Sequence, residues 1–376
     1  MPAPTGIGVL QTRLSHVDGA NGVLIIGGYD LEQLAGKVTF EEAAHLLWTG
    51  RLPSPGEAEA LSREMAALQA IPASTMAIVR EAAGRGAPPI DALRMATATL
   101  SLDLPRPNDI SHDADVASAK MLVARFPTIV AAYLRAGAGQ APIAPRADLG
   151  LAANFLYMLN GSEPDAIVVR ALETYWVTVI DHGMNASAFT ARVIASTRSD
   201  MVSAVTGAIG ALKGPLHGGA PGPVLDMLVD IGTADRAEPW VREELAAGRR
   251  IMGFGHRIYK VRDPRAEVLS KVAEEMAGAL LQDRRLFDLA REVEATALRV
   301  LEEVKPGRNL RTNVEFYTAL VLQSIGLPPA VFVAMFACGR CAGWCAHVME
   351  QHAADRLIRP QSDYIGPRGM TLQRPR

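Results

Sequence analysis

Hydrophobic and polar positions follow a helical period along most of the 376-residue chain. Apolar residues recur every three or four positions in segments that are separated by short breaks, as in amphipathic helices. The spacing predicts helices over residues 58–68, 91–101, 115–136, 149–159, 164–180, 186–196, 201–211, 224–231, 238–247, 263–277, 287–303, 313–325 and 329–351. Residues 102–109 and 140–146 are predicted loops. Because strands and helices do not alternate, the pattern predicts an all-α fold.

The first 30 residues differ from this helical pattern. Two apolar runs flank the turn signals Asp18-Gly19 and Asn21-Gly22, which predicts a small β-hairpin and the only sheet of the fold. Helical signals begin shortly afterwards.

Two predicted helices have capping signals at their first residues. Thr39 and Glu42 have the spacing of a capping box, and Gly50 stands where a helix would end. The sequence Ser54-Pro55 with Glu57 repeats the start signal, with proline at the first helical position.

Composition narrows the class of protein. Hydrophobic residues make up 49% of the chain and charged residues 21%, which is typical of a globular protein with a large core. The formal net charge of -2 gives no general attraction for nucleic acid or for an acidic membrane surface. The N-terminus lacks the pattern of a signal peptide, and no apolar run reaches the length of a membrane span. We therefore expect a cytoplasmic protein with no nucleic-acid or membrane partner.

The three cysteines are Cys338, Cys341 and Cys345. An odd, clustered set is a poor disulfide framework, which favours a reducing compartment. A metal site would use the same residues, but on one helix the outer two lie about 10 Å apart along the axis, too far for a common metal. We expect no metal and interpret the cysteines as small apolar residues of the core.

Two histidines and one acid are the candidate catalytic residues. His217 occurs in GPLHGG, His256 in GFGHRIYKVRDPR and Glu315 in NVEFY. Each histidine alone could equally be a hydrogen-bonded core residue. Glycine beside an imidazole, however, lets a ligand approach the ring and the main chain together. His217 also precedes a predicted helix, whose dipole would lower the pKa of the imidazole and keep it neutral. A carboxylate with neutral donors suits proton abstraction beside a carbonyl.

A run of basic residues surrounds His256. It could be a solvated face, but the glycines among the guanidinium groups favour an anion site. The run comprises Arg249, Arg250, Arg257, Lys260, Arg262 and Arg265. Gly253-Phe-Gly255 is no dinucleotide fingerprint, because no strand precedes it and the third glycine is missing.

Together these segments resemble the citrate synthase family. DHGMNASAFTARVIAST, GPLHGGAPGPVLDML, GFGHRIYKVRDPRA, NVEFY and MFACGRCAGWCAHVMEQ follow in that family's order, and GVLIIGGYDLEQLAGKVTFEEAAHLL resembles its N-terminal region. The resemblance covers nearly the whole chain. It implies an all-helical homodimer whose subunits have a large domain, residues 1–216 and 321–376, and a small domain, residues 217–320, that closes over the ligands.

The resemblance also implies the reaction and the residues that perform it. Acetyl-CoA would condense with oxaloacetate and water to give citrate and CoA, with no cofactor besides the CoA thioester. Glu315 would deprotonate the acetyl methyl group, His217 would bind the thioester oxygen, and His256 would polarise the keto group of oxaloacetate. The implied oxaloacetate contacts are His182, Arg265, Phe336, Arg340 and, from the partner subunit, Arg359. The implied CoA phosphate contacts are Arg257, Lys260 and Arg262, with Arg308 and Arg311 as further candidates.

This chain departs from the family pattern at three places. Glu315 stands where aspartate is commoner, and the extra methylene could displace the carboxylate by about 1 Å, which can cost about a hundredfold in rate. The N-terminus lacks the extra segment of the NADH-responsive hexameric form, so we expect a plain dimer. DHGMNAS lacks an acid after His182. Two alternatives stay open: a 2-methylcitrate synthase that uses propionyl-CoA, since one methyl group discriminates by only about 1–3 kcal/mol, and a catalytically silent relative that binds CoA or dicarboxylates.

Overall fold

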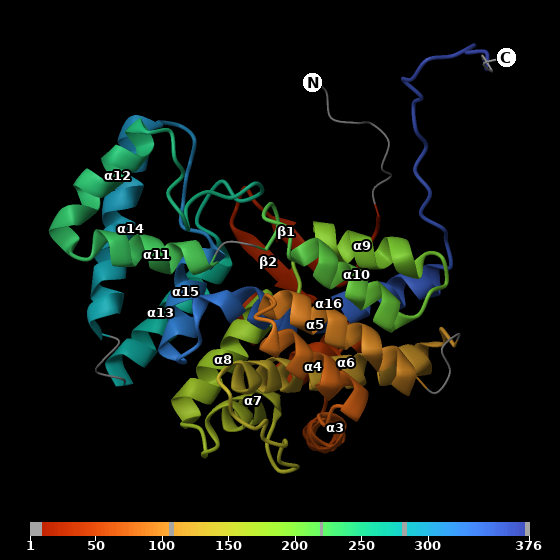
Figure 1. The fold of residues 1–376 in the computed structure, drawn as a ribbon. Helices are drawn as coiled ribbons and strands as arrows, with labels where there is room; N and C mark the ends of the chain where they lie inside the picture. Colours follow the sequence, from red (N-terminus) through yellow and green to blue (C-terminus); the bar gives the residue numbers. More distant parts are fainter. Residues whose placement is uncertain (1–9, 105–108, 219–220, 280–283, 373–376) are drawn as a thin grey trace.

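The described residues form a mainly helical fold with one small sheet near the N-terminus (Figure 1). The computed structural model describes residues 10–104, 109–218, 221–279 and 284–372. Its α-helices are α1 (Leu31–Leu34), α2 (Phe40–Thr49), α3 (Pro55–Leu68), α4 (Ala73–Gly84), α5 (Pro89–Thr99), α6 (His112–Gly137), α7 (Leu151–Asn160), α8 (Ala166–Val179), α9 (Ala186–Ala195), α10 (Met201–Leu212), α11 (Pro221–Ile231), α12 (Ala237–Ala246), α13 (Pro264–Ala279), α14 (Arg284–Val304), α15 (Val314–Ser324) and α16 (Phe332–Ala354). Short 3₁₀ turns are η1 (Leu100–Asp103), η2 (Ala234–Arg236) and η4 (Pro329–Val331). The all-α prediction is confirmed.

The predicted hairpin is present. Strand β1 (Ser15–Asp18) pairs antiparallel with β2 (Val23–Ile26), so that Ser15 lies opposite Ile26. The Asp18 carboxylate accepts hydrogen bonds from the amides of Ala20 and Asn21 and closes the turn. A third short strand, β3 (Tyr29–Asp30), which the sequence pattern did not predict, pairs with β2.

The helix signals read from the sequence operate as expected. The Thr39 hydroxyl accepts from the amide of Glu42, whose carboxylate accepts from the amide of Thr39. Gly50 ends α2 in the left-handed conformation, at φ 81°. Helix α4 escaped prediction. Its N-cap residue is Pro72, which makes no side-chain capping bond, so the segment carries no start signal of its own.

Helix α16 is the centre of the larger group of helices. It packs against α2, α5, α6, α8, α9 and α10. Cys338, Cys341 and Cys345 are buried free cysteines on it, which confirms that they pack as small core residues. By length and composition, α6 and the segment from η4 through α16 could cross a membrane, but 67% and 89% of their most apolar windows are buried inside the protein. Both are core helices of the fold.

Helices α11 to α15 gather on one side of the molecule (left in Figure 1). Within this group α12 packs on α14, and α13 and α11 pack on α15. Helix α8 of the larger group packs on α13 and α15. After α16, residues 355–372 run away from the body as an extended segment (Figure 1).

Candidate active site

The loop that carries His256 is bonded to the segment that precedes Glu315. Gly255 donates its amide hydrogen to the carbonyl of Arg311 (2.7 Å), and Asn313 donates to the carbonyl of Gly253 (2.9 Å). These backbone bonds bring two motifs that are 50 or more residues apart in the chain into one site.

Glycine is required at one point of this junction. Gly253 has a φ of 81°, and a Cβ atom there would lie 2.8 Å from the ring of Phe316 on α15. Any side chain would therefore push the His256 loop away from the helix that carries Glu315.

The tautomer of His256 follows from its partners. The amides of Ile258 and Tyr259 donate to Nδ1 at 3.1 and 3.2 Å, so the neutral ring carries its proton on Nε2. Burial, and then the charge of Arg265, lowers the pKa of His256 to about 4. Nε2 lies 3.4 Å from Arg265 Nη2. Both groups are donors, so an oxygen atom placed between them would accept from both.

Arg265 is held in place by Asp263. The guanidinium donates from Nε to Oδ1 (3.0 Å) and from Nη2 to Oδ2 (2.8 Å), and it is almost fully buried. Asp263 also accepts from the amide of Val314 at the start of α15. Sequence reasoning missed Asp263, although an acid directly before Pro264 at a helix start was a signal for it. The pair fixes the guanidinium fork beside His256.

His182 faces the same space. Its Nε2 lies 3.0 Å from the hydroxyl of Tyr259, and its ring stands edge-on to that of His256 with 5.7 Å between centroids. Burial, followed by the charges of Arg265 and Arg340, lowers the pKa of His182 well below its usual value. This imidazole is therefore neutral as well.

Arg340 brings a second guanidinium to the site from the core helix α16. Only 1% of it is exposed. Its Nε donates to the carbonyl of Val179 (2.6 Å), and its guanidinium lies over the ring of Phe336, 4.7 Å from the centroid. Its Nη2 is buried and has no hydrogen-bond partner within the described chain. A buried, unpaired donor is costly, and a ligand carboxylate would satisfy it.

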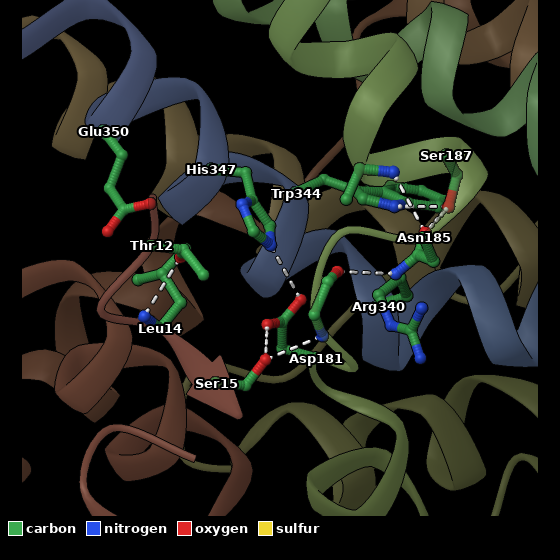
Figure 2. Close-up of polar contacts among 12 residues, drawn as sticks. Thr12, Leu14, Ser15, Asp181, Asn185, Ser187, Arg340, Trp344, His347 and Glu350 are labelled. Atoms are coloured by element: carbon green, nitrogen blue, oxygen red, sulfur yellow. Dashed lines mark hydrogen bonds and ion pairs between the residues drawn. The ribbon is translucent and has the colours of Figure 1, made fainter. Parts of the chain in front are cut away.

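His217 has the opposite tautomer from His256. The amide of Ser187 donates to its Nε2 (3.3 Å), and the Ser187 hydroxyl lies 2.8 Å from the same nitrogen. That hydroxyl also accepts from Trp344 Nε1 at 3.0 Å (Figure 2). The neutral ring therefore carries its proton on Nδ1. The pKa of His217 is lowered to about 4, first by burial and then by the charge of Arg340. The nearby Gly219 lies outside the described residues.

Glu315 lies in the first turn of α15, where its amide donates to the capping side chain of Asn313 (3.0 Å). The carboxyl is half-buried. Burial raises the pKa of Glu315 to about 7, while the charge of Arg265 opposes the rise and that of Asp263 adds to it. A carboxyl poised near neutral pH is suited to take a proton from carbon.

Comparison with known proteins identifies the family of the chain. Residues 3–361 match the family described as "Citrate synthase, C-terminal domain". The chain belongs to the citrate synthase family. It is 39% identical over 368 residues to Citrate synthase 2 of Bacillus subtilis (strain 168), covering 98% of this chain and 97% of that protein. It is 37% identical over 361 residues to 2-methylcitrate synthase of Mycobacterium tuberculosis (strain ATCC 25618 / H37Rv), covering 96% and 89%.

A solved citrate synthase has the same fold. The enzyme of Thermoplasma acidophilum, in a ternary complex with carboxymethyl coenzyme A and oxaloacetate, superposes with a TM-score of 0.89 at 28% identity, covering 98% of this chain and 96% of that one. Membership of the citrate synthase family makes the protein an enzyme of the acyltransferase class.

The basic residues that the family resemblance implies as CoA phosphate contacts differ from one another in their surroundings. Arg257 and Lys260 are exposed. Arg262 turns toward two carboxylates, with Nη1 3.3 Å from Glu267 and Nη2 3.5 Å from Glu294. A phosphate at Arg262 would have to compete with these partners.

The remaining candidate residues are Arg308, Arg311 and Arg359. Arg308 is exposed, and Arg311 lies 3.8 Å from a carboxylate oxygen of Glu302. Arg359 is exposed on the extended segment 355–372, which leaves the body of the subunit (Figure 1). A single chain therefore brings Arg265 and Arg340 together with the histidines, but it does not bring Arg359 to them.

Proposed function

We propose that the protein condenses acetyl-CoA with oxaloacetate and water to give citrate and CoA. The observation that carries this is Arg340 Nη2, a buried donor that has no partner among the described residues, in a site that also holds neutral imidazoles and a carboxyl with a pKa of about 7. Such a site is built for a dianionic keto acid beside a carbon acid.

The hydrogen positions suggest how the two substrates are activated. Glu315, as the carboxylate, accepts a proton from the methyl carbon of acetyl-CoA, and Nδ1–H of His217 donates to the thioester oxygen where negative charge develops. The new carbon–carbon bond forms as the enol attacks the keto carbon of oxaloacetate. Nε2–H of His256 donates to the keto oxygen, which becomes the hydroxyl of citryl-CoA. Water then cleaves the thioester and releases CoA.

Residues of both subunits would hold the oxaloacetate carboxylates and orient the keto group. Arg265 and Arg340 supply the charge from within the subunit, His182 supplies a neutral contact, and Phe336 packs beneath Arg340. Arg359 would come from a partner subunit, which makes the dimer part of the site.

A homodimer accounts for the extended tail. Large apolar side chains on it are strongly exposed: Tyr364 at 63%, Ile365 at 98%, Met370 at 82% and Leu372 at 81%. Exposing an extended apolar segment to water is unfavourable. A second copy of the chain would cover this segment and accept Arg359 into its own site.

Exposed Arg257 and Lys260 are our candidates for the CoA phosphates, with Arg262 as a third that must exchange its carboxylate partners. We propose residues 217–320 as the small domain, which closes to keep water from the enol. The reaction needs no cofactor besides the thioester substrate, and the buried reduced cysteines suit a cytoplasmic enzyme.

Purified protein should release free thiol from acetyl-CoA only when oxaloacetate is present. No such release would favour a silent relative, in which the longer side chain of Glu315 misplaces the base. Propionyl-CoA in the same assay tests the second candidate, which the name of the M. tuberculosis relative raises. A higher kcat/KM with propionyl-CoA than with acetyl-CoA would make the protein a 2-methylcitrate synthase.

A further inference from the structure

The N-terminal hairpin touches the supports of two site histidines. One end of β1 contacts the segment around His182, and the turn after β1 contacts the backbone that orients His256. Given the proposed function, we propose that this hairpin is a positioning brace: Ser15 sets the place of His182, and the close approach of Gly19 sets that of His256.

Ser15 bonds to both neighbours of His182. Its hydroxyl donates to a carboxylate oxygen of Asp181 and accepts the amide hydrogen of Gly183 at 2.7 Å (Figure 2). The other oxygen of Asp181 lies 3.2 Å from Nε2 of His347 on α16. The backbone before and after His182 is thus tied to β1, and through Asp181 to the core.

Gly19 packs on the peptide group that orients His256. A Cβ atom at Gly19 would lie 2.3 Å from the carbonyl oxygen of Ile258 and 2.7 Å from its carbonyl carbon. That carbonyl belongs to the same planar unit as the amide of Tyr259, which donates to His256 Nδ1. The next amide, that of Lys260, donates to the carbonyl of Gly19 (2.8 Å).

The contact between the turn and the loop leaves no room for a methyl group. Moving the Ile258 carbonyl from 2.3 Å to an ordinary contact requires a shift of about 1 Å. Because the peptide unit is rigid, the amide of Tyr259 would move with it and weaken the bond that holds the ring of His256. Gly19 does not adopt a positive φ, so alanine there acts through this contact rather than through backbone strain.

Gly19→Ala tests the brace at His256. We expect kcat/KM for oxaloacetate to fall about 10- to 100-fold, since a shift of about 1 Å at a reacting group has that cost. The 13C shift of the keto carbon of bound [2-13C]oxaloacetate should move toward the value of free oxaloacetate, because His256 polarises that carbonyl. Ala20→Ser, at the exposed neighbouring position of the same turn, is the matched control and should behave as wild type.

Ser15→Ala tests the other end. It should raise KM for oxaloacetate several-fold while leaving the keto-carbon shift unchanged, and Ser15→Thr, which keeps the hydroxyl, should restore KM. A folded Gly19→Ala enzyme with the rate and the keto-carbon shift of Ala20→Ser would overturn the brace at His256. Equal KM values for Ser15→Ala and wild type would overturn it at His182. Wild-type protein that fails to condense the substrates would instead overturn the proposed function.

Discussion

Raising the pH from about 6 to about 8 should accelerate the reaction about tenfold, because Glu315 must lose its own proton before it can take one from the substrate. With the pKa of Glu315 at about 7, the carboxyl is about 9% ionised at the lower pH and about 91% at the higher one. His217 and His256, whose pKa values lie near 4, do not titrate in this range.

Bound oxaloacetate should increase this rate ratio. The charge of Arg265 lowers the pKa of Glu315 in the free site. Bound oxaloacetate would neutralise part of that charge, so the midpoint in the complex should lie at 7 or above. The assay is the disappearance of thioester absorbance at saturating oxaloacetate, with kcat/KM for acetyl-CoA measured across the range.

Three variants test whether the carboxyl of Glu315 is the base. Glu315→Gln should lower turnover by about 10²–10⁴ and abolish the pH dependence, while oxaloacetate still binds. Glu315→Asp should keep the dependence, because the acid remains. Glu292→Gln, at an exposed position on α14, is the control and should match wild type. A wild-type rate that is flat between pH 6 and 8, or a Glu315→Gln enzyme that still titrates near 7, would refute the assignment of the base.

Other predictions concern the arginines and a buried ion pair. Arg359→Ala should weaken oxaloacetate binding in calorimetry without changing the dimer's mass by light scattering; unchanged affinity would contradict a partner arginine in the site. Arg340→Lys should raise KM for oxaloacetate about 10- to 100-fold, because an ammonium cannot reach Val179 and the substrate at once. Burial alone would lower the pKa of His352, but the hydrogen bond between His352 and Asp115 (2.8 Å), together with the other polar contacts of the ring, outweighs burial, and the net pKa of His352 is raised. The stabilisation from the His352–Asp115 pair is therefore fully present below about pH 6.5. It is lost as the pH rises through the pKa of His352 in the folded protein. The Tm difference between wild type and Asp115→Asn should shrink from pH 6 to 9, and a constant difference would show that the pair does not titrate.

The fold was largely predictable because helical periodicity and capping are local properties. The capping box at Thr39 and Glu42 and the C-terminal Gly50 are where the sequence places them. Helix α4 was missed because its start has no capping side chain, and β3 because two residues carry no recognisable period. Packing on neighbouring elements, rather than local signals, defines both.

The sequence by itself determined which residues are chemically able to act: the glycine-flanked histidines, the acid of NVEFY and the arginines of the family motifs. Only the tertiary structure decided their states. Proton placement on His217 and His256 depends on amides of Ser187, Ile258 and Tyr259, and a pKa of about 7 at Glu315 arises from burial among groups distant in the chain. Hydrogen-bond geometry and desolvation are sums over spatial neighbours, and the linear order of residues does not contain those sums.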